Sequence, residues 1–215
     1  ILARDRCGIK PLYYYHQPGV GIRFASEIKS LLCDRSIPRE IDLEALDLYL
    51  AFLATPSPWT LLKGIKKLEP GEMLIIDDGE VSLRTYWDPW SHIRTDRSIS
   101  DEEAVQLVHD NVRDSVRSHL LSDVPVGAFL SGGIDSSVVV GLMAELCGPG
   151  VPTFSIGFEG QSLFDETSDA RQIAKTFMTE HHEERLSPND LLELLPQLMW
   201  AFDEPLADSS ALPTF

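Results

Sequence analysis

The stretch that decides the fold is Val126-Gly127-Ala128-Phe129-Leu130-Ser131-Gly132-Gly133-Ile134-Asp135-Ser136-Ser137-Val138-Val139-Val140. An apolar run ends at Leu130, a glycine-rich turn follows, and a second apolar run begins at Val138. Glycines let the backbone turn sharply and approach an anion with no side chain in the way. The start of the following helix offers unpaired N–H groups and the positive end of a dipole. The stretch therefore predicts a phosphate-binding turn between a strand and a helix.

The side chains of this turn support the same prediction. Ser136 and Ser137 add hydroxyl donors, and Asp135 offers a carboxylate for Mg²⁺. A serine–glycine turn with an N-capping serine is the simpler interpretation. However, six of the seven residues from Ser131 to Ser137 are polar or glycine, and they are flanked as a phosphate loop requires. No lysine follows the glycines as in a Walker A loop, and the dinucleotide spacing G-x-G-x-x-G is absent.

The heptad from Ser131 to Ser137 resembles the pyrophosphate loop of the N-type ATP pyrophosphatases. Those enzymes cleave ATP between the α- and β-phosphates and adenylate a substrate. They include the asparagine, GMP, NAD and argininosuccinate synthetases. The loop by itself does not choose among them.

The second half of the chain alternates predicted strands and helices. Ser100-Asp101-Glu102-Glu103 has the form of a capping box, and it opens a helix whose apolar residues recur at helical spacing. We expect those residues to form one buried face: Val105, Val108, Val112, Val116 and Leu120. The elements that follow are expected as strands at 126–130, 152–158 and 181–186 and helices to Cys147, at 165–177 and at 189–202.

Strands that alternate with helices predict a doubly wound α/β fold, a parallel sheet with helices on both faces. Ligands bind such sheets at the carboxyl ends of the strands. Both Ser131-Gly132-Gly133 and Ile156-Gly157-Phe158 are predicted to lie at such ends.

The first half of the chain is expected to be richer in strands. Aromatic and β-branched residues around Gln17-Pro18-Gly19 indicate a hairpin, followed by a short helix that Ser26 is expected to cap. In the next segment Asp42 is expected to cap a helix. Asp77-Asp78-Gly79-Glu80 between apolar runs indicates a tight hairpin.

Four further blocks resemble the asparagine synthetase family, and together the resemblance covers essentially the whole chain. Arg4-Asp5-Arg6-Cys7-Gly8-Ile9-Lys10-Pro11-Leu12-Tyr13-Tyr14, with Phe24-Ala25-Ser26-Glu27-Ile28-Lys29, is similar to the end of the class II glutaminase domain. The segment 62–71 is similar to the family's linker, and 123–127 to the start of its synthetase domain. Residues 202–208 also resemble this family. The blocks disfavour GMP and NAD synthetases, which lack this type of glutaminase ahead of the loop.

The resemblance implies a domain organisation. Residues 1–32 would be the end of an N-terminal-nucleophile glutaminase domain, 33–99 a linker with a helix and a hairpin, and 100–215 part of an adenine nucleotide alpha hydrolase-like synthetase domain. The chain starts and stops in mid-pattern, so we expect an internal portion of a longer protein that is inactive by itself. The glutaminase nucleophile is expected to lie outside it.

The resemblance also implies a reaction. Aspartate and ATP would give β-aspartyl-AMP and pyrophosphate with Mg²⁺ required, and ammonia from glutamine would then yield asparagine, AMP and glutamate. By matching positions, the loop residues that cradle the departing phosphates would be Ser131, Gly132, Gly133, Ser136 and Ser137. Asp135 would hold Mg²⁺. Leu130 and Ile156 would contact the adenosine, largely through backbone atoms, although ordinary strand core is the interpretation that the residues alone favour.

Two other functions remain open at this point. An asparagine synthetase-like amidotransferase could act on another carboxylate, such as an envelope sugar acid or a β-lactam precursor. A non-catalytic homologue is the third alternative, against which the intact loop argues.

The composition limits the kinds of partner that we expect the protein to bind. The formal charge of −16 argues against a nucleic acid. The charges of residues 1–50 balance, whereas residues 151–215 carry a net charge of −9. No apolar run reaches the roughly 20 residues that span a bilayer. The three cysteines are few and widely spaced, as in a reducing compartment, so a cytoplasmic protein is expected. Family members are often homodimers.

Three features could suggest other sites. Cys7 resembles the nucleophile of class II glutaminases, but that cysteine must carry a free α-amine, so Cys7 is expected to serve packing. His181-His182-Glu183 could suggest a metal site, but neighbouring residues of a strand point to opposite faces. Asp203, Glu204 and Asp208 are predicted to form either a loop over the pyrophosphate or an exposed acidic turn.

Overall fold

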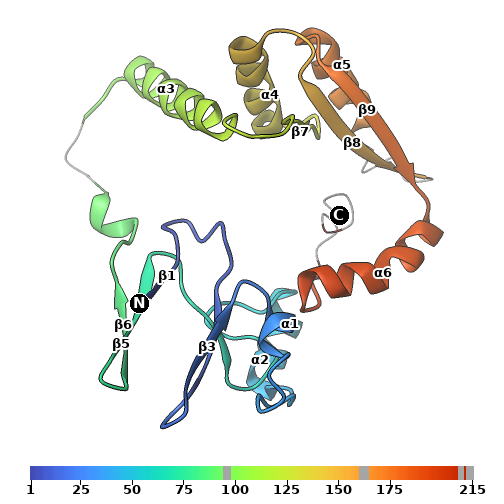
Figure 1. The fold of residues 1–215 in the computed structure, drawn as a ribbon. Helices are drawn as coiled ribbons and strands as arrows, with labels where there is room; N and C mark the ends of the chain where they lie inside the picture. The colour runs from blue at the N-terminus through green and yellow to red at the C-terminus, as the bar shows by residue number, and fades with distance from the viewer. Residues whose placement is uncertain (94–97, 160–164, 208–210, 212–215) are drawn as a thin grey trace. The chain divides into compact units, whose positions relative to one another are not determined.

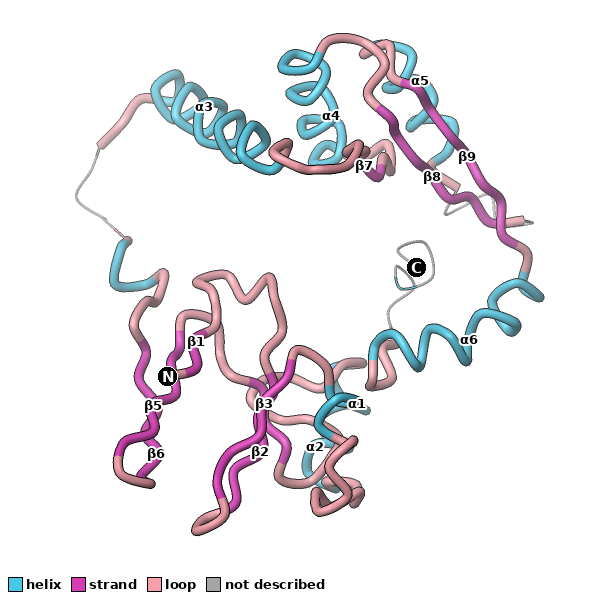
Figure 2. The backbone as a smooth tube through the Cα atoms, viewed as in Figure 1, coloured by secondary structure: helices cyan, strands magenta, loops and turns pink. Residues whose placement is uncertain are grey.

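The computed structural model describes residues 1–93, 98–159, 165–207 and 211 (Figures 1 and 2). The chain forms two compact units. The first comprises Ile1–Thr95 with Pro196–Phe215, and the second comprises Asp96–Leu195. Helix α6 (Pro188–Phe202) belongs to both units, and Pro196 inside it marks the division.

Two small antiparallel sheets organise the first unit. One sheet has the order β3-β2-β4, and the other has the order β1-β5-β6. Their strands are β1 (Leu2–Ala3), β2 (Tyr13–Gln17), β3 (Gly21–Ala25), β4 (Ile65–Lys67), β5 (Glu72–Asp77) and β6 (Glu80–Thr85). Strands of the segment 33–99 thus pair with strands of 1–32, because β4 pairs with β2 and β5 pairs with β1.

Besides the second half of α6, the described part of this unit contains α1 (Ile28–Leu31), α2 (Leu43–Phe52) and the 3₁₀ helix η1 (Trp90–His92). The core under α1 consists of the buried residues Ile28, Leu31, Ile37 and Ile65. Burial of these four side chains joins α1 to β4. Strand β4 pairs with β2, the central strand of its sheet.

Most local predictions for this unit are confirmed. The Asp42 carboxylate accepts hydrogen bonds from Glu44 N and Ala45 N and caps α2. Asp78 and Gly79 have positive φ values of 45° and 84° at the tip of the β5–β6 hairpin, as a tight primed turn requires. The predicted cap at Ser26 is wrong, since Glu27 occupies the N-cap position of α1 without a side-chain bond.

The second unit is built on a parallel sheet of order β7-β8-β9. Its elements are α3 (Asp101–His119), β7 (Ala128–Phe129), α4 (Ile134–Cys147), β8 (Pro152–Phe158), α5 (Thr167–Thr176), β9 (Glu180–Leu186) and the first half of α6. Figure 2 shows β8 and β9 as two long neighbouring strands. The predicted alternation of strand and helix is therefore present, although β7 is shorter than expected.

The doubly wound arrangement is not confirmed in the described residues. Helix α4 contacts β7, and α5 contacts β8 and β9. The chain passes from β7 to β8 to β9 in one direction across the sheet. Because such crossovers are right-handed, α4 and α5 lie on the same face of the sheet. Burial agrees, because Thr153 and Ser155 are buried on the helix-covered face whereas Phe154 is 41% exposed on the other. Helices on the second face would require the strand order to reverse, and the order of β7, β8 and β9 does not.

Helix α3 meets the prediction at its start and only partly along its face. Ser100 and Glu103 form the expected capping box. Val116 is buried against Leu142 and Met143 of α4. Val105 and Val108 are 70% and 62% exposed, so the prediction of a fully buried face is wrong for the first half of the helix. In the described residues the apolar cluster formed with α4 reaches only the second half. No helix in the described part of the chain is long and apolar enough to cross a membrane.

Candidate functional site

The predicted phosphate loop lies between β7 and α4. Leu130 continues the pairing of β7, since its N–H donates to the carbonyl of Phe154 over 2.8 Å. Gly133 is the N-cap residue of α4, and it provides no side-chain cap for the first N–H groups of that 14-residue helix. These N–H groups and the helix dipole favour an anion at this position.

The loop serines are bonded mainly to each other and to the loop backbone. Ser131 Oγ lies 3.0 Å from Ser136 Oγ and accepts from Gly133 N at 3.3 Å. Ser136 Oγ and Ser137 Oγ donate to the carbonyl of Gly133 at 3.2 and 2.5 Å. The hydroxyls are thus held around one turn of backbone, from which they can turn toward a bound anion.

Gly132 is the residue on which the shape of the loop depends. Its φ is +83°, a region that side chains other than glycine rarely adopt. A Cβ atom here would lie 2.8 Å from Asp169 Cβ and 3.0 Å from Ala170 N, both on α5. The loop therefore packs directly on the first turn of α5, and the beginnings of α4 and α5 lie at the same edge of the sheet.

Leu130 and Ile156 differ in what they offer to a ligand. The Leu130 side chain is 2% exposed and packs with Val140, Ala170 and Ala174, so only its backbone is accessible. The Leu130 carbonyl accepts a hydrogen bond from the hydroxyl of Ser155. Ile156 is half-buried and pairs with Glu184 of β9. Both residues lie near the carboxyl ends of adjacent parallel strands.

A charged cluster forms just before α5, around Asp165. Asp165 accepts hydrogen bonds from the N–H and the hydroxyl of Thr167, at 3.1 and 2.5 Å, and forms an ion pair with Arg185 at 2.9 Å. The hydrogen bonds from Thr167, and then the charge of Arg185, hold the pKa of Asp165 below its ordinary value. This carboxylate therefore remains charged at neutral pH.

Asp135 is the single carboxylate of the heptad, and its side chain is exposed at the first turn of α4. Among the described residues no group of three or more His, Cys, Asp or Glu side chains is placed to hold a metal ion. Mg²⁺ is commonly bound through only one or two carboxylates together with substrate phosphates and water. Asp135 therefore fits a magnesium ion that arrives with a polyphosphate.

Residues 107–215 match the asparagine synthase family, and residues 1–87 match the glutamine amidotransferase domain. The chain belongs to the asparagine synthase family. It is 42% identical over 215 residues to asparagine synthetase [glutamine-hydrolyzing] 1 of Bacillus subtilis, covering 99% of this chain and 33% of that protein.

Two other relatives show the range of names in the family. A Methanocaldococcus jannaschii protein, provisionally named a glutamine-hydrolyzing asparagine synthetase, is 40% identical over 219 residues, covering 99% of this chain and 41% of that protein. Amidase chyE of Penicillium rubens is 32% identical over 232 residues, with 99% and 33% covered. The chain thus spans about a third to two fifths of the length of these relatives.

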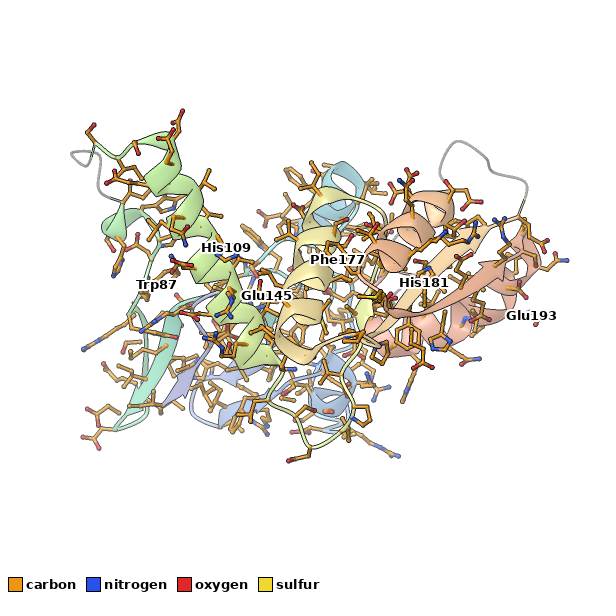
Figure 3. All side chains as sticks on the ribbon, turned by 90° about the horizontal axis from the view of Figure 1, so that it is seen from above. Trp87, His109, Glu145, Phe177, His181 and Glu193 are labelled. Carbon is orange, nitrogen blue, oxygen red and sulfur yellow. The ribbon has the colours of Figure 1, made fainter. Side chains whose placement is uncertain are left out.

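An open depression lies next to the loop of this asparagine synthase segment. It extends from Gly132 along α4 to Glu145 and to Phe177 at the end of α5, and both of the latter side chains are labelled in Figure 3. Gly141 permits the close approach, because a Cβ there would lie 2.9 Å from the Phe177 ring. Gly132 and Ser137 of the loop form one end of the depression, and mainly apolar side chains line the rest.

The side chains of the paired histidines lie on opposite faces of the sheet. His181 Nδ1 lies 2.9 Å from Thr153 Oγ1 on the helix-covered face of the sheet. Its Nε2 is 3.3 Å from the Glu183 carboxylate but makes no aligned hydrogen bond. His182 stacks on Phe154 on the other face, with ring centroids 5.2 Å apart. The two rings therefore cannot share one ion.

Two expectations about individual residues are wrong. Cys7 is exposed rather than packed, because the turn around it is held by the Asp5 carboxylate, which accepts from the backbone N–H groups of Cys7, Ile9 and Lys10. Of the two interpretations of 203–204, the exposed acidic turn is wrong, because the side chains of Asp203 and Glu204 are only 7% and 11% exposed. Asp208 lies outside the described residues.

Sequence reasoning also missed the neighbours of the loop. Asp169 and Ala170 touch Gly132 from α5, and Asp165 forms the charged cluster with Arg185. Only the spacing Asp165-x-Thr167, which is typical of a side-chain turn before a helix, could have indicated one of these contacts.

Proposed function

We propose that this chain is the part of a glutamine-hydrolysing asparagine synthetase that binds ATP. The observation that carries the proposal is the intact heptad from Ser131 to Ser137 at the start of α4, in a chain that matches both an asparagine synthase and a glutamine amidotransferase domain. Because the chain spans about a third of the similar B. subtilis protein, the activity is proposed for the whole enzyme that contains it.

The proposed reaction has two steps. An oxygen of the aspartate β-carboxylate attacks the α-phosphorus of ATP, which forms β-aspartyl-AMP and releases pyrophosphate. Ammonia, which glutamine hydrolysis supplies together with glutamate, then attacks the acyl carbon and displaces AMP, giving asparagine. Adenylation is needed because a free carboxylate is a poor electrophile, whereas AMP is a good leaving group.

We assign the residues of the loop to the phosphates. The N–H groups at the start of α4 and the hydroxyls of Ser131, Ser136 and Ser137 would bind the β- and γ-phosphates, which leave as pyrophosphate. Gly132 and Gly133 would let these phosphates approach the backbone. Backbone atoms of Leu130 and Ile156 would contact the adenosine, which fits the burial of the Leu130 side chain.

The proposal includes a magnesium ion because the phosphates of ATP need a positive charge beside them. Asp169 lies beside Gly132, and the heptad contains no lysine or arginine. Asp135 would hold an Mg²⁺ ion that accompanies ATP, and the ion would offset the charge of the phosphates when bound.

The proposal also covers the domain boundaries, the substrates, the compartment and the oligomeric state. Residues 1–32 would be the end of the glutaminase domain, 33–99 a linker and 100–215 part of a doubly wound synthetase domain. Aspartate, glutamine and ATP would be the substrates, in a cytoplasmic homodimer that binds neither nucleic acid nor membrane.

The test is aspartate-dependent exchange of labelled pyrophosphate into ATP by the whole enzyme. Asp135→Asn and Ser136→Ala should each slow the exchange by about tenfold or more, because each removes one charge-assisted contact to the phosphates or the metal. Asp114→Asn is the matched control, since Asp114 is an exposed aspartate of α3 that pairs with Arg117. Wild-type exchange in both loop variants would overturn the assignment.

An amidotransferase for a different carboxylate is the second candidate. The identity of 32% to a protein named an amidase favours keeping it. Exchange that a sugar acid or a β-lactam precursor supports, and that aspartate does not, would select this candidate. Failure of the whole protein to bind ATP with Mg²⁺ in calorimetry would instead select a non-catalytic homologue.

A further inference from the structure

The segment that follows α6 carries two buried carboxylates, Asp203 and Glu204, which we call the acidic clasp. Both lie in the first unit, although they belong to the part of the sequence that matches asparagine synthase. Their partners come from residues 28–67, within the match to the glutamine amidotransferase domain. The clasp therefore joins the two family segments inside one compact unit.

Asp203 binds the start of α1. One carboxylate oxygen accepts from Ile28 N at 2.6 Å, and the other lies 3.1 Å from Lys29 Nζ. Lys29 also donates to the carbonyl of Trp200 at 3.0 Å and lies 5.5 Å from the centre of its ring. Asp203 thus replaces the missing side-chain cap of α1 from a position 175 residues further along the chain.

Glu204 makes the second half of the clasp. One of its oxygens accepts from Leu61 N at 2.5 Å, and the other lies 3.0 Å from Lys67 Nζ. Lys67 also donates to the carbonyl of Thr55 at 2.6 Å. Each carboxylate therefore has one backbone N–H and one lysine, which is what a buried charge requires.

The two negative charges affect the pKa values of neighbouring side chains. Burial, followed by the charges of Glu204 and Asp203, raises the pKa of Tyr13 on β2. Burial works to lower the pKa of Lys29, yet the hydrogen bonds and charges of Asp203 and Glu27 raise it overall. Tyr13 and Lys29 thus lie close enough to the two carboxylates for their pKa values to respond to them.

The backbone indicates that the carboxylate itself matters at position 203. Asp203 ends α6 with a φ of 63°, where helices commonly place glycine. An aspartate at this position accepts a conformational cost that glycine would avoid. The gain in the structure is the pair of bonds to Ile28 and Lys29.

We propose that Asp203 and Glu204 are positioning residues that hold the end of the asparagine synthase segment on the amidotransferase-type unit, so that ammonia released from glutamine is used for amide formation. This inference rests on the proposed function, in which one part of the enzyme makes ammonia and another consumes it. Ammonia that escapes is diluted and protonated in water, so transfer depends on how the two segments are held. A clasp of two largely buried ion pairs fixes that attachment.

The test compares nitrogen sources in the whole enzyme. In the double variant Asp203→Asn/Glu204→Gln, glutamine-supported asparagine synthesis should fall by about tenfold or more. Ammonium-supported synthesis should stay within about twofold, because the variant leaves the ATP loop unchanged. Glutamate formed per asparagine should rise clearly above the wild-type value. Glu40→Gln is the matched control, since it removes an exposed ion pair with Lys63 in the same unit.

Each outcome decides the matter. An equal loss with both nitrogen sources would show a merely structural role, and an unchanged glutamate-to-asparagine ratio would show no role in coupling; either overturns the inference. If the double variant does not fold, Lys67→Met carries the same test, because Glu204 then keeps its bond to Leu61 N. Failure of the wild-type enzyme to make asparagine from either source would instead overturn the proposed function.

Discussion

Replacing Gly132 by alanine tests how the phosphate loop is supported. The new Cβ would lie 2.8 Å from Asp169 Cβ and 3.0 Å from Ala170 N, distances at which an atom must move. The φ of +83° adds a backbone cost of about 1–2 kcal/mol for an L-residue. Overpacking adds about 1–3 kcal/mol. We therefore expect Gly132→Ala to destabilise the enzyme by about 2–5 kcal/mol.

The same change should act on catalysis, because the clash can be relieved only by moving the loop or the first turn of α5. Displacements of this kind cost up to about 100-fold in rate, so we expect pyrophosphate exchange per folded enzyme to fall by about 10- to 100-fold. The assay is exchange of labelled pyrophosphate into ATP, normalised to the folded fraction from circular dichroism.

Gly148→Ala is the matched control for this substitution. Gly148 also has a φ of +83°, but a Cβ there would meet nothing within 4 Å. It follows α4 at the end opposite the loop, about 21 Å away along a 14-residue helix. This variant should lose about 1–3 kcal/mol of stability and keep its exchange rate. Equal exchange in Gly132→Ala and the wild type, or an equal loss in Gly148→Ala, would refute the reasoning.

Three further substitutions test separate parts of the account. Leu130→Ala should destabilise the enzyme by about 2–5 kcal/mol in thermal unfolding yet leave the KM for ATP nearly unchanged, and a large rise in KM would contradict the backbone-only contact. Ser100→Ala should cost about 1 kcal/mol by removing the capping box, and no measurable loss in denaturant unfolding would argue against that cap. Asp5→Asn should lower stability at neutral pH, because backbone N–H groups depress the pKa of the Asp5 carboxyl in the folded state. The stability that Asp5 contributes is present above the unfolded pKa of about 4 and is lost as pH falls through the folded pKa. The deficit of Asp5→Asn should therefore shrink in acid, and a deficit independent of pH would contradict this origin.

Local features of the fold could be predicted from the sequence because each depends on a few neighbouring residues. The capping box at Ser100, the cap at Asp42 and the turn at Asp78-Gly79 are all found where the residues place them. The turn between β7 and α4 belongs to the same class, since a strand, two glycines and a helix start follow one another directly.

Features that depend on distant contacts were missed. Ser26 has the chemistry of a cap, but the first N–H of α1 is satisfied by Asp203. The apolar spacing of α3 predicts a continuous buried face, yet its partner α4 covers only the half near Val116. Val105 remains exposed for this reason. Periodicity shows which face of a helix is apolar, and it does not show how far a partner extends along it.

The acidic residues near the end of the chain illustrate the same limit. Asp203 and Glu204 follow an amphipathic helix, where charged residues usually meet solvent. Their burial depends on Lys29 and Lys67, which are far away in the sequence and are themselves unremarkable there. The contact of Gly132 with Asp169 is likewise set by the packing of α5 on the loop.

Transfer of oxygen-18 tests the central claim most directly. Aspartate labelled in its β-carboxylate is incubated with the whole enzyme, ATP and glutamine, and the products are analysed by mass spectrometry. If the loop at Ser131–Ser137 supports adenylation, one labelled oxygen must appear in AMP, because the attacking carboxylate oxygen leaves with the adenylate. Label in inorganic phosphate, or unlabelled AMP in the presence of newly formed asparagine, would contradict the account.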